Sequence, residues 1–462
     1  MCQLESLKRL NHEGAIRRAL RELPTTLEEI YEKILVNIPP QDWFVGRLAL
    51  AILCTTSEFW EHGYTAEMVL VAIAYYLKDD DPCYETSILD LDALQEICSC
   101  LISVSHQEEA DSFGGTGHSA IIAHYTVREF LTSDRILAGP AKYFHIEDPP
   151  DKVLLRSVMR YFNDIARKAP PPKQVLQSLS RGVSSFHRYC KEMGPIFMSY
   201  TQHMISSDPH LLSLVIQIFE LSSPGYDHIM EVFRNYEKFN ASVDNFWADN
   251  AHSETPLAIV VLNLIRIDFS LLAESILEIQ GNSPLTAEVR FKFRGDFECS
   301  LFEAIVLLGN TQIVKSLLDA GAMAFDRTTI LYFVLFAAEN WANRPWYIRN
   351  ECVPPCSLIQ RFLRANADPS PTGFRMTPLQ VAVYKEDIES VRSLLEVGVR
   401  ANEVGDPEGK PPPMSDLEDD RNASPLFICR NFIRRTRLKL KRSEMEDLLL
   451  AYSAEEFTVN KS

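Results

Sequence analysis

The residue patterns that carry phosphate chemistry, metal binding or nucleophilic catalysis are not found in this sequence. The nearest approach to a phosphate-binding loop is Gly114–Ser119, which lacks the lysine that reaches the phosphates of a bound nucleotide. It lies between two β-prone runs, Leu101–His106 and Ala120–His124, so we interpret it as the tip of a hairpin. Metalloprotease and serine-hydrolase motifs are absent too. We therefore expect no enzyme activity, no metal and no cofactor.

The cysteines and histidines give no further site. The eleven histidines are scattered, and the ten cysteines lack the paired spacing of a zinc site. His187 and Cys190 share a predicted helical face, and an isolated pair of this kind is more often packed than metal-bound. Ten cysteines are also too few for a disulfide scaffold, so we expect reduced, structural cysteines and a cytoplasmic setting.

The composition is that of a folded protein with several domains. The chain has 462 residues, of which 46% are hydrophobic and 24% are charged. Its net charge of −17 disfavours nucleic acid as a partner, because binding a phosphate backbone needs clustered Lys and Arg. The apolar runs are shorter than the roughly 20 residues of a membrane span, so no membrane association is expected.

The first third of the sequence predicts a small helical domain that ends in a two-stranded hairpin. Thr25 or Thr26 precedes two glutamates and an apolar stripe, which is typical of a capped helix start. Further helices are expected at 44–57, 66–76, 89–100 and 126–131, with the hairpin before the last of them. Helices followed by a hairpin form the outline of a winged-helix-like domain at 23–140.

Two segments of this region resemble fungal NACHT-type (STAND) proteins, which are signal-transducing P-loop ATPases that often carry C-terminal ankyrin repeats. The sequences LPTTLEEIYEKIL at 23–35 and HYTVREFL at 124–131 resemble the two ends of the winged-helix region of that family. Residues 1–22 resemble the end of its ATPase domain, whose P-loop core is missing here. The resemblance therefore implies a truncated relative: a gene fragment, a mis-called gene start or a genuine short form.

The resemblance also singles out His124. In the family, a histidine at the end of the winged helix contacts the phosphate of the bound nucleotide. His124 is the matching position, although Tyr125 stands where many relatives have aspartate. Without a phosphate loop, nothing else in the chain would hold a nucleotide, so His124 is a cofactor-binding residue only if an ATPase domain were supplied. We interpret it instead as a packing residue between the hairpin and the next helix.

Residues 141–245 predict a helical connector. Helical periodicity is present at 153–166, 173–189 and 210–221. The prolines at 170–172 and the Ser-Pro-Gly sequence at 223–225 are expected to end helices.

Residues 246–462 contain degenerate repeats that resemble ankyrin units. The clearest unit has a start close to the T-P-L-H-x-A signature and a matching second-helix ending. Its signature residues are Thr377, Pro378, Leu379, Ala382, Leu394, Leu395, Gly398 and Asn402. A second helix ending recurs at Leu317, Leu318 and Gly321, and a third occurs where Asn366 takes the place of glycine. Asparagine tolerates the left-handed backbone that this turn requires.

The repeats are irregular in spacing. The interval from Gly321 to Asn366 is 45 residues and that from Asn366 to Gly398 is 32, against about 33 in a regular ankyrin array. Insertions are therefore expected at 341–356 and 403–422, in a stack of four or five units. The Thr-Pro pair is expected to cap and start the first helix of a unit, and the glycine to end the second.

The sequence thus predicts a mainly α protein with a winged-helix-like domain, a helical connector and a C-terminal ankyrin-repeat solenoid. Ankyrin stacks bind partners and catalyse nothing by themselves, so we expect a non-catalytic scaffold for an unidentified protein partner. The alternatives are part of a nucleotide-dependent (ATP/GTP) signalling switch, or a winged-helix DNA binder, which the helices without Lys or Arg disfavour. The basic run Arg434–Arg442 is either a nuclear-import or acidic-partner segment, or a solvated helix face, which we favour.

Overall fold

The described part of the chain is mainly helical, as the sequence predicts. The computed structural model describes residues 26–55, 64–78, 90–106, 118–147, 151–172, 180–220, 222–236, 256–266, 269–280, 291–293, 297–308, 310–319, 325–342, 356–412, 423–432 and 439–456. The chain divides into two compact units. Unit 1 runs to Ile218 and includes Ser223–Val232; unit 2 comprises Phe219–Ser222 and the chain from Phe233 onward.

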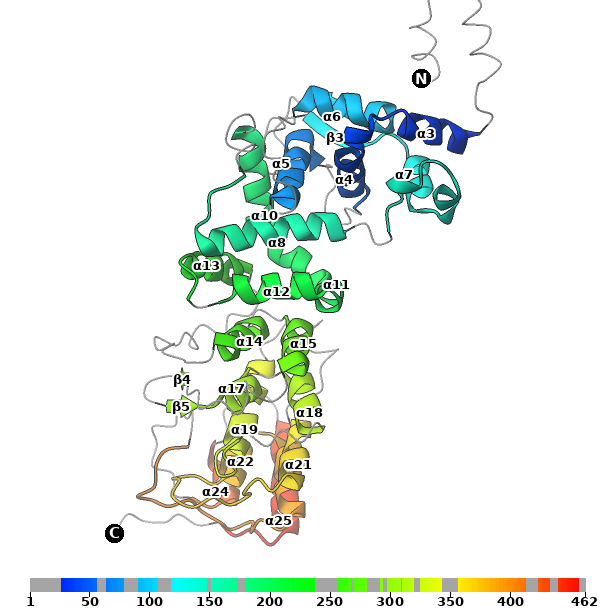
Figure 1. The fold of residues 1–462 in the computed structure, drawn as a ribbon. Coiled ribbons are helices and arrows are strands. Elements are labelled where there is room, and N and C mark those ends of the chain that lie inside the picture. The colour runs from blue at the N-terminus through cyan, green and yellow to red at the C-terminus, as the bar shows by residue number, and fades with distance from the viewer. Residues whose placement is uncertain are drawn as a thin grey trace, which may run out of the picture. The chain divides into compact units, whose positions relative to one another are not determined.

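The N-terminal part of unit 1 combines helices with a small antiparallel sheet (Figure 1). Its helices are α3 (Leu27–Val36), α4 (Trp43–Cys54), α5 (Ala66–Leu77), α6 (Leu91–Cys98) and α7 (Tyr125–Thr132), with 3-10 turns at Pro40–Asp42, Ser99–Leu101, Asp134–Ala138 and Lys142–Phe144. The strands β1 (Tyr64–Thr65), β2 (Ile102–His106) and β3 (His118–Ile122) lie in the order β1-β3-β2. All the predicted helices of this region are present, and β1 is an addition to them.

Side-chain caps fix the starts of these helices. The hydroxyl of Thr26 accepts a hydrogen bond from Glu29 N at 3.2 Å, which confirms the expected start of α3. Thr65 and Asp90 cap α5 and α6 in the same way. Helix α5 is apolar on almost every side because it lies in the middle of unit 1, in contact with α4, α8 and α10.

The C-terminal part of unit 1 packs against α4 and α5. Its helices are α8 (Lys152–Arg167), α10 (Ser180–Tyr200), α11 (Gln202–Ser207), α12 (Pro209–Ile218) and α13 (Tyr226–Tyr236), whose last residues fall in unit 2. Helices α8 and α12 end before the prolines and the Ser-Pro-Gly sequence that were expected to stop them. The rings of Tyr75, Tyr161 and Phe186 pack together at centroid distances of 5.4–5.7 Å and join α5, α8 and α10.

Six cysteines lie at positions whose burial the structure describes, and five of them are buried apolar residues. Cys54, Cys98, Cys190, Cys299 and Cys429 form no disulfide and are buried. Burial raises the pKa of the Cys54 and Cys98 thiols to about 12, so both stay protonated. The expectation of reduced cysteines is wrong for Cys100, which is disulfide-bonded. Unlike its neighbour Cys98, Cys100 is only half-buried.

Unit 2 is built from pairs of helices that follow one another along the chain. We call each pair a helix hairpin. The first helices are α14 (Pro256–Arg266), α17 (Leu301–Leu307), α19 (Ile330–Ala342), α22 (Pro378–Tyr384) and α24 (Pro425–Phe432). The second helices are α15 (Ser270–Gln280), α18 (Thr311–Asp319), α21 (Cys356–Arg364), α23 (Ile388–Glu396) and α25 (Lys439–Ala451).

The helix hairpins stack side by side in two rows (Figure 1). Each first helix contacts the first helix of the next hairpin, from α14 to α24. Among the second helices, α18, α21, α23 and α25 likewise each contact the next one, and these helices form the second row. A short β-hairpin, β4 (Phe291–Phe293) with β5 (Phe297–Cys299), precedes α17 and was not expected from the sequence. Among the described helices of both units, none combines the length and the apolar character that a membrane span needs.

Candidate functional site

Two of the first helices of unit 2, α17 and α22, begin with reciprocal caps. The Thr377 hydroxyl accepts a hydrogen bond from Gln380 N at 3.2 Å, and Gln380 Oε1 accepts one from Thr377 N at 2.7 Å. Ser300 and Glu303 repeat this geometry at the start of α17, at 3.2 and 2.7 Å. Pro378 occupies the first turn of α22, where its missing N–H costs nothing. The expected capping role of the Thr-Pro pair is thus confirmed.

The third residue of three consecutive first helices bonds to the main chain at the start of the next helix hairpin. Glu303 Oε1 accepts from Asp326 N at 3.2 Å, just before α19, and also from the Thr329 hydroxyl. Tyr332 donates its hydroxyl to Met376 O at 2.7 Å. Gln380 Nε2 donates to Ala423 O at 2.8 Å. Met376 and Ala423 each immediately precede the capping residue of the following first helix.

The three side chains that make these bonds are buried. Glu303 is 2% exposed, and Tyr332 and Gln380 are fully buried. Burial raises the pKa of Tyr332 far above its ordinary value, so its hydroxyl keeps the proton that it donates. Because a buried polar side chain must find a partner inside the protein, these three side chains join three successive pairs of neighbouring helix hairpins, from α17 to α24.

The turns that leave the second helices also repeat. Asn366, Gly398 and Ser453 follow α21, α23 and α25 and have φ angles of +62°, +99° and +60°. In each turn, the N–H of the left-handed residue bonds to the carbonyl three residues back, and the next N–H to the carbonyl five residues back. This is the hydrogen-bond pattern of a Schellman helix end. The expectation that Asn366 replaces glycine in a left-handed turn is confirmed.

The Asn366 turn makes a specific prediction. The variant Asn366→Gly is expected to keep the free energy of unfolding within about 0.5 kcal/mol of the native value, because glycine adopts the left-handed backbone freely. The variant Asn366→Val is expected to lose about 1–2 kcal/mol, because a β-branched residue is strained there. Urea denaturation of both variants measures the difference, and equal stability of the two would contradict it.

The remaining signature residues lie in the core of the stack or at its turns. Leu379, Ala382, Leu394 and Leu395 are at most 2% exposed, Leu317 is buried and Leu318 is half-buried. Asn402 connects two turns, since its side chain accepts from Glu455 N at 2.5 Å and donates to Ser453 O at 3.1 Å. Gly321 lies outside the described residues.

Two neighbouring loops of the stack are joined through their main chains. Arg375 N donates to Lys410 O, Lys410 N to Gly373 O, and Asp406 N to Phe374 O, each at 2.8 Å. Gly405 is required here, because a Cβ atom at that position would lie 2.4 Å from the main chain of Arg375. The predicted insertion at 403–422 is described as far as Pro412 and begins with this loop.

His124 does not pack between the hairpin and α7. It is exposed and caps α7, with Nδ1 accepting from Thr126 N at 3.3 Å and lying 2.9 Å from the Thr126 hydroxyl. Its ring lies beside that of Tyr125 at a centroid distance of 4.5 Å. The packing interpretation is therefore wrong: the imidazole of His124 satisfies one free N–H group at the start of α7, at the surface.

The sequence did not reveal that a helix hairpin begins at Thr329, just before α19. The order Thr-Ile-Leu-Tyr stands where the clearest unit has Thr-Pro-Leu-Gln, so the threonine and the leucine were the available signal. Tyr332 was missed as a counterpart of Gln380 because an aromatic residue in an apolar run looks like a packing residue. Its hydroxyl donates to the main chain of the next helix hairpin, as the Gln380 amide does.

Within the described residues, no group of three or more His, Cys, Asp or Glu side chains is placed to hold a metal ion. The basic run Arg434–Arg442 lies mostly outside them. Comparison of the chain with protein-family models, with curated proteins and with solved structures finds no match.

Proposed function

We propose that this protein is a non-catalytic interaction scaffold, in which a stack of ankyrin-type repeats binds a protein partner. The observation that carries the proposal is the recurring bond from the third residue of one first helix to the start of the next helix hairpin. A contact of the same kind at successive positions is typical of a repeat array, in which each unit contacts its neighbours. Stacked arrays of this type present extended surfaces that bind other macromolecules.

The proposed family remains that of the NACHT-associated proteins with a winged helix and C-terminal ankyrin repeats. The order α4, β1, α5, α6, β2, β3 and the sheet order β1-β3-β2 support the winged-helix part of this proposal. The exposed residues of α6 include Asp92 and Glu96, which does not favour a DNA-reading helix. On the basis of the same resemblance, we propose that the protein has a signalling role in the cytoplasm.

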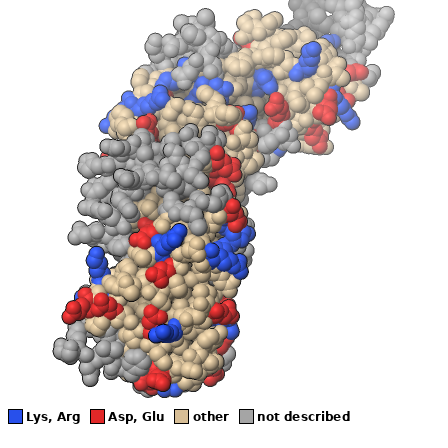
Figure 2. All heavy atoms as spheres, turned by 60° about the horizontal axis from the view of Figure 1, so that its bottom comes forward, with Lys and Arg blue, Asp and Glu red and all other residues tan. Residues whose placement is uncertain are grey.

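The joined loops at 373–375 and 406–410 are the surface that we assign to the partner. Glu408 and Lys410 are exposed there, while the main chain beneath them is fixed by hydrogen bonds. Because the main chain is already held in place, little main-chain conformational entropy is lost when these exposed side chains bind a partner. On the face seen in Figure 2, the described basic and acidic side chains are interspersed without a continuous basic stripe, which suits a protein partner better than nucleic acid.

A selection experiment tests this proposal. The purified full chain is used as bait against a displayed library of protein fragments, and the affinity of each enriched fragment is measured. The double variant Glu408→Lys with Lys410→Glu keeps the net charge and is expected to weaken binding at least tenfold. The matched control, Glu389→Lys with Arg392→Glu, makes the same exchange on α23 and is expected to leave the affinity unchanged.

Two results would reject the scaffold proposal. One is equal loss of binding in both double variants, or no loss in either, because the assigned surface would then not be the interface. The other is micromolar affinity of the purified chain for ATP or GTP, which would favour the nucleotide-switch alternative.

A further inference from the structure

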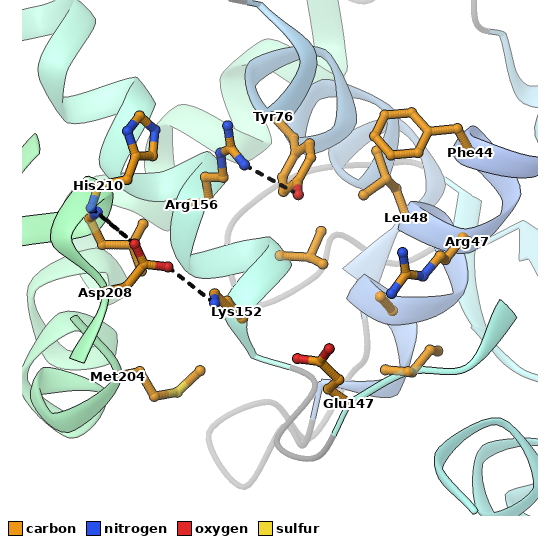
Figure 3. Close-up of a pocket in the computed structure, with 14 residues that line it drawn as sticks. Phe44, Arg47, Leu48, Tyr76, Glu147, Lys152, Arg156, Met204, Asp208 and His210 are labelled. Atoms are coloured by element: carbon orange, nitrogen blue, oxygen red, sulfur yellow. Dashed lines mark hydrogen bonds and ion pairs between the residues drawn. The ribbon is translucent and has the colours of Figure 1, made fainter. Parts of the chain in front are cut away.

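Unit 1 contains a pocket that the proposed scaffold does not use. It has a volume of about 550 Å³, within the range of about 300–1,000 Å³ that is usual for small-molecule sites. Helix α4 supplies one wall, α8 another, and the α11–α12 segment a third, with Tyr76 of α5 between them (Figure 3). Every residue that lines it belongs to unit 1.

The floor of the pocket is apolar. Leu48, Ala51, Ile146 and Leu211 line it and are at most 3% exposed as residues of the core. Phe44 packs edge-on against the ring of Tyr76 at a centroid distance of 6.3 Å. An apolar body placed against this floor would be removed from water without displacing any buried polar group.

The charged groups of the pocket leave an excess of positive charge. Three of them are basic, Arg47, Lys152 and Arg156, and two are acidic, Glu147 and Asp208. This local excess occurs in a chain whose net charge is −17. The imbalance is therefore a property of the pocket and not of the overall composition.

Lys152 and Asp208 neutralise each other. Their N–O distance is 3.1 Å, and Asp208 also accepts a hydrogen bond from His210 N at 3.0 Å, as Figure 3 shows. Partial burial alone would raise the pKa of Asp208, but the hydrogen bonds from Lys152 and from the N–H groups of Leu211 and His210 lower it below its ordinary value. Asp208 is thus ionised at neutral pH and engages the Lys152 charge.

For Arg47, the described residues of the chain provide no acidic partner. It is half-buried, its Nε donates to His145 O at 3.3 Å, and its guanidinium lies 5.8 Å from the Tyr143 ring centroid. Among the described residues Arg47 forms no ion pair. Arg156, across the pocket on α8, lies 4.7 Å from the Tyr76 ring centroid. A partly desolvated guanidinium is stabilised when an anion reaches it, and a carboxylate matches its two parallel donors.

We propose that this pocket binds a small amphipathic carboxylate. Its carboxylate pairs with Arg47, and its apolar body lies against Leu48, Ala51 and Leu211. The net excess of one positive charge fits a monoanion. A nucleotide phosphate group carries more negative charge than this excess would balance.

Binding of decanoate to the full chain tests the proposal. Isothermal titration calorimetry is expected to give a dissociation constant in the micromolar range for decanoate and at least tenfold weaker binding for decanol, which has the same chain without the charge. Arg47→Gln is expected to weaken decanoate binding at least tenfold. Arg135→Gln, which removes an arginine that is 74% exposed on its side chain, is expected to leave it unchanged.

A second measurement uses the unaltered protein, so that it does not depend on the folding of a variant. Raising the salt concentration is expected to weaken the binding of decanoate but not that of decanol. Equal affinity for decanol and decanoate overturns the proposal, as does binding that Arg47→Gln leaves unchanged in a folded variant. Displacement of decanoate by inorganic phosphate at similar concentration would reassign the pocket to phosphate and also reject it. None of these outcomes bears on the partner surface of unit 2.

Discussion

The substitution Gln380→Ala is expected to lower the free energy of unfolding of unit 2 by about 3 kcal/mol. Gln380 is fully buried and bonds to three main-chain groups: Thr377 N, Gly405 N and Ala423 O. Alanine leaves all three groups without this partner, and each buried polar group left unsatisfied costs about 1–3 kcal/mol. Part of this cost is recovered where water enters the space.

Chemical denaturation measures the loss, and hydrogen exchange of peptides that cover α22 and α24 assigns it to unit 2. The matched control is Gln360→Ala, because Gln360 is exposed on α21 and, within the described part of the chain, makes one bond, of 3.4 Å, to Ser393. That control is expected to change stability by less than about 0.5 kcal/mol. A similar loss in both variants would mean that Gln380 does not join the helix hairpins in the way described.

The second large effect is expected at Phe302. This residue of α17 is fully buried, and its ring lies 5.5 Å from that of Phe325 and 6.0 Å from that of Phe362 on α21. Phe302→Ala removes one member of this cluster and leaves a cavity, so about 4 kcal/mol of unfolding free energy is expected to be lost. Denaturant titration followed by circular dichroism measures it.

A graded series provides the control for Phe302. Phe302→Leu keeps most of the apolar volume and is expected to lose about 1–2 kcal/mol. Leu271→Ala, at a position on α15 that is 41% exposed, is expected to lose less than about 1 kcal/mol. If leucine and alanine at 302 are equally destabilising, filling of the aromatic cluster is not what holds α17 against α21.

Local signals in the sequence predicted much of the secondary structure. Thr26 and Thr377 precede apolar periodicity and form caps because a short hydroxyl side chain satisfies the free N–H groups of a helix start. Asn366 was correctly expected in a left-handed turn, since few other residues tolerate that backbone. These features depend on residues within one or two turns of each other.

Features that depend on distant residues were not predicted. The pocket of unit 1 brings together Arg47, Arg156 and Asp208, which lie far apart in the sequence and meet only through helix packing. The β1 strand was missed because two residues, Tyr64 and Thr65, carry no periodic pattern and gain their strand character by pairing with β3. Cys100 was missed because sequence spacing does not reveal which cysteine forms a disulfide.

The bonds between neighbouring helix hairpins have a consequence for which side chains these positions can accept. Glu303, Tyr332 and Gln380 each reach a main-chain atom, a group that every residue offers regardless of its side chain. A mutation in one helix hairpin therefore does not require a compensating change in the next one, provided that the side chain still reaches the main chain. An acid, a phenol and an amide serve the same purpose here, so the contact between hairpins does not depend on one residue type.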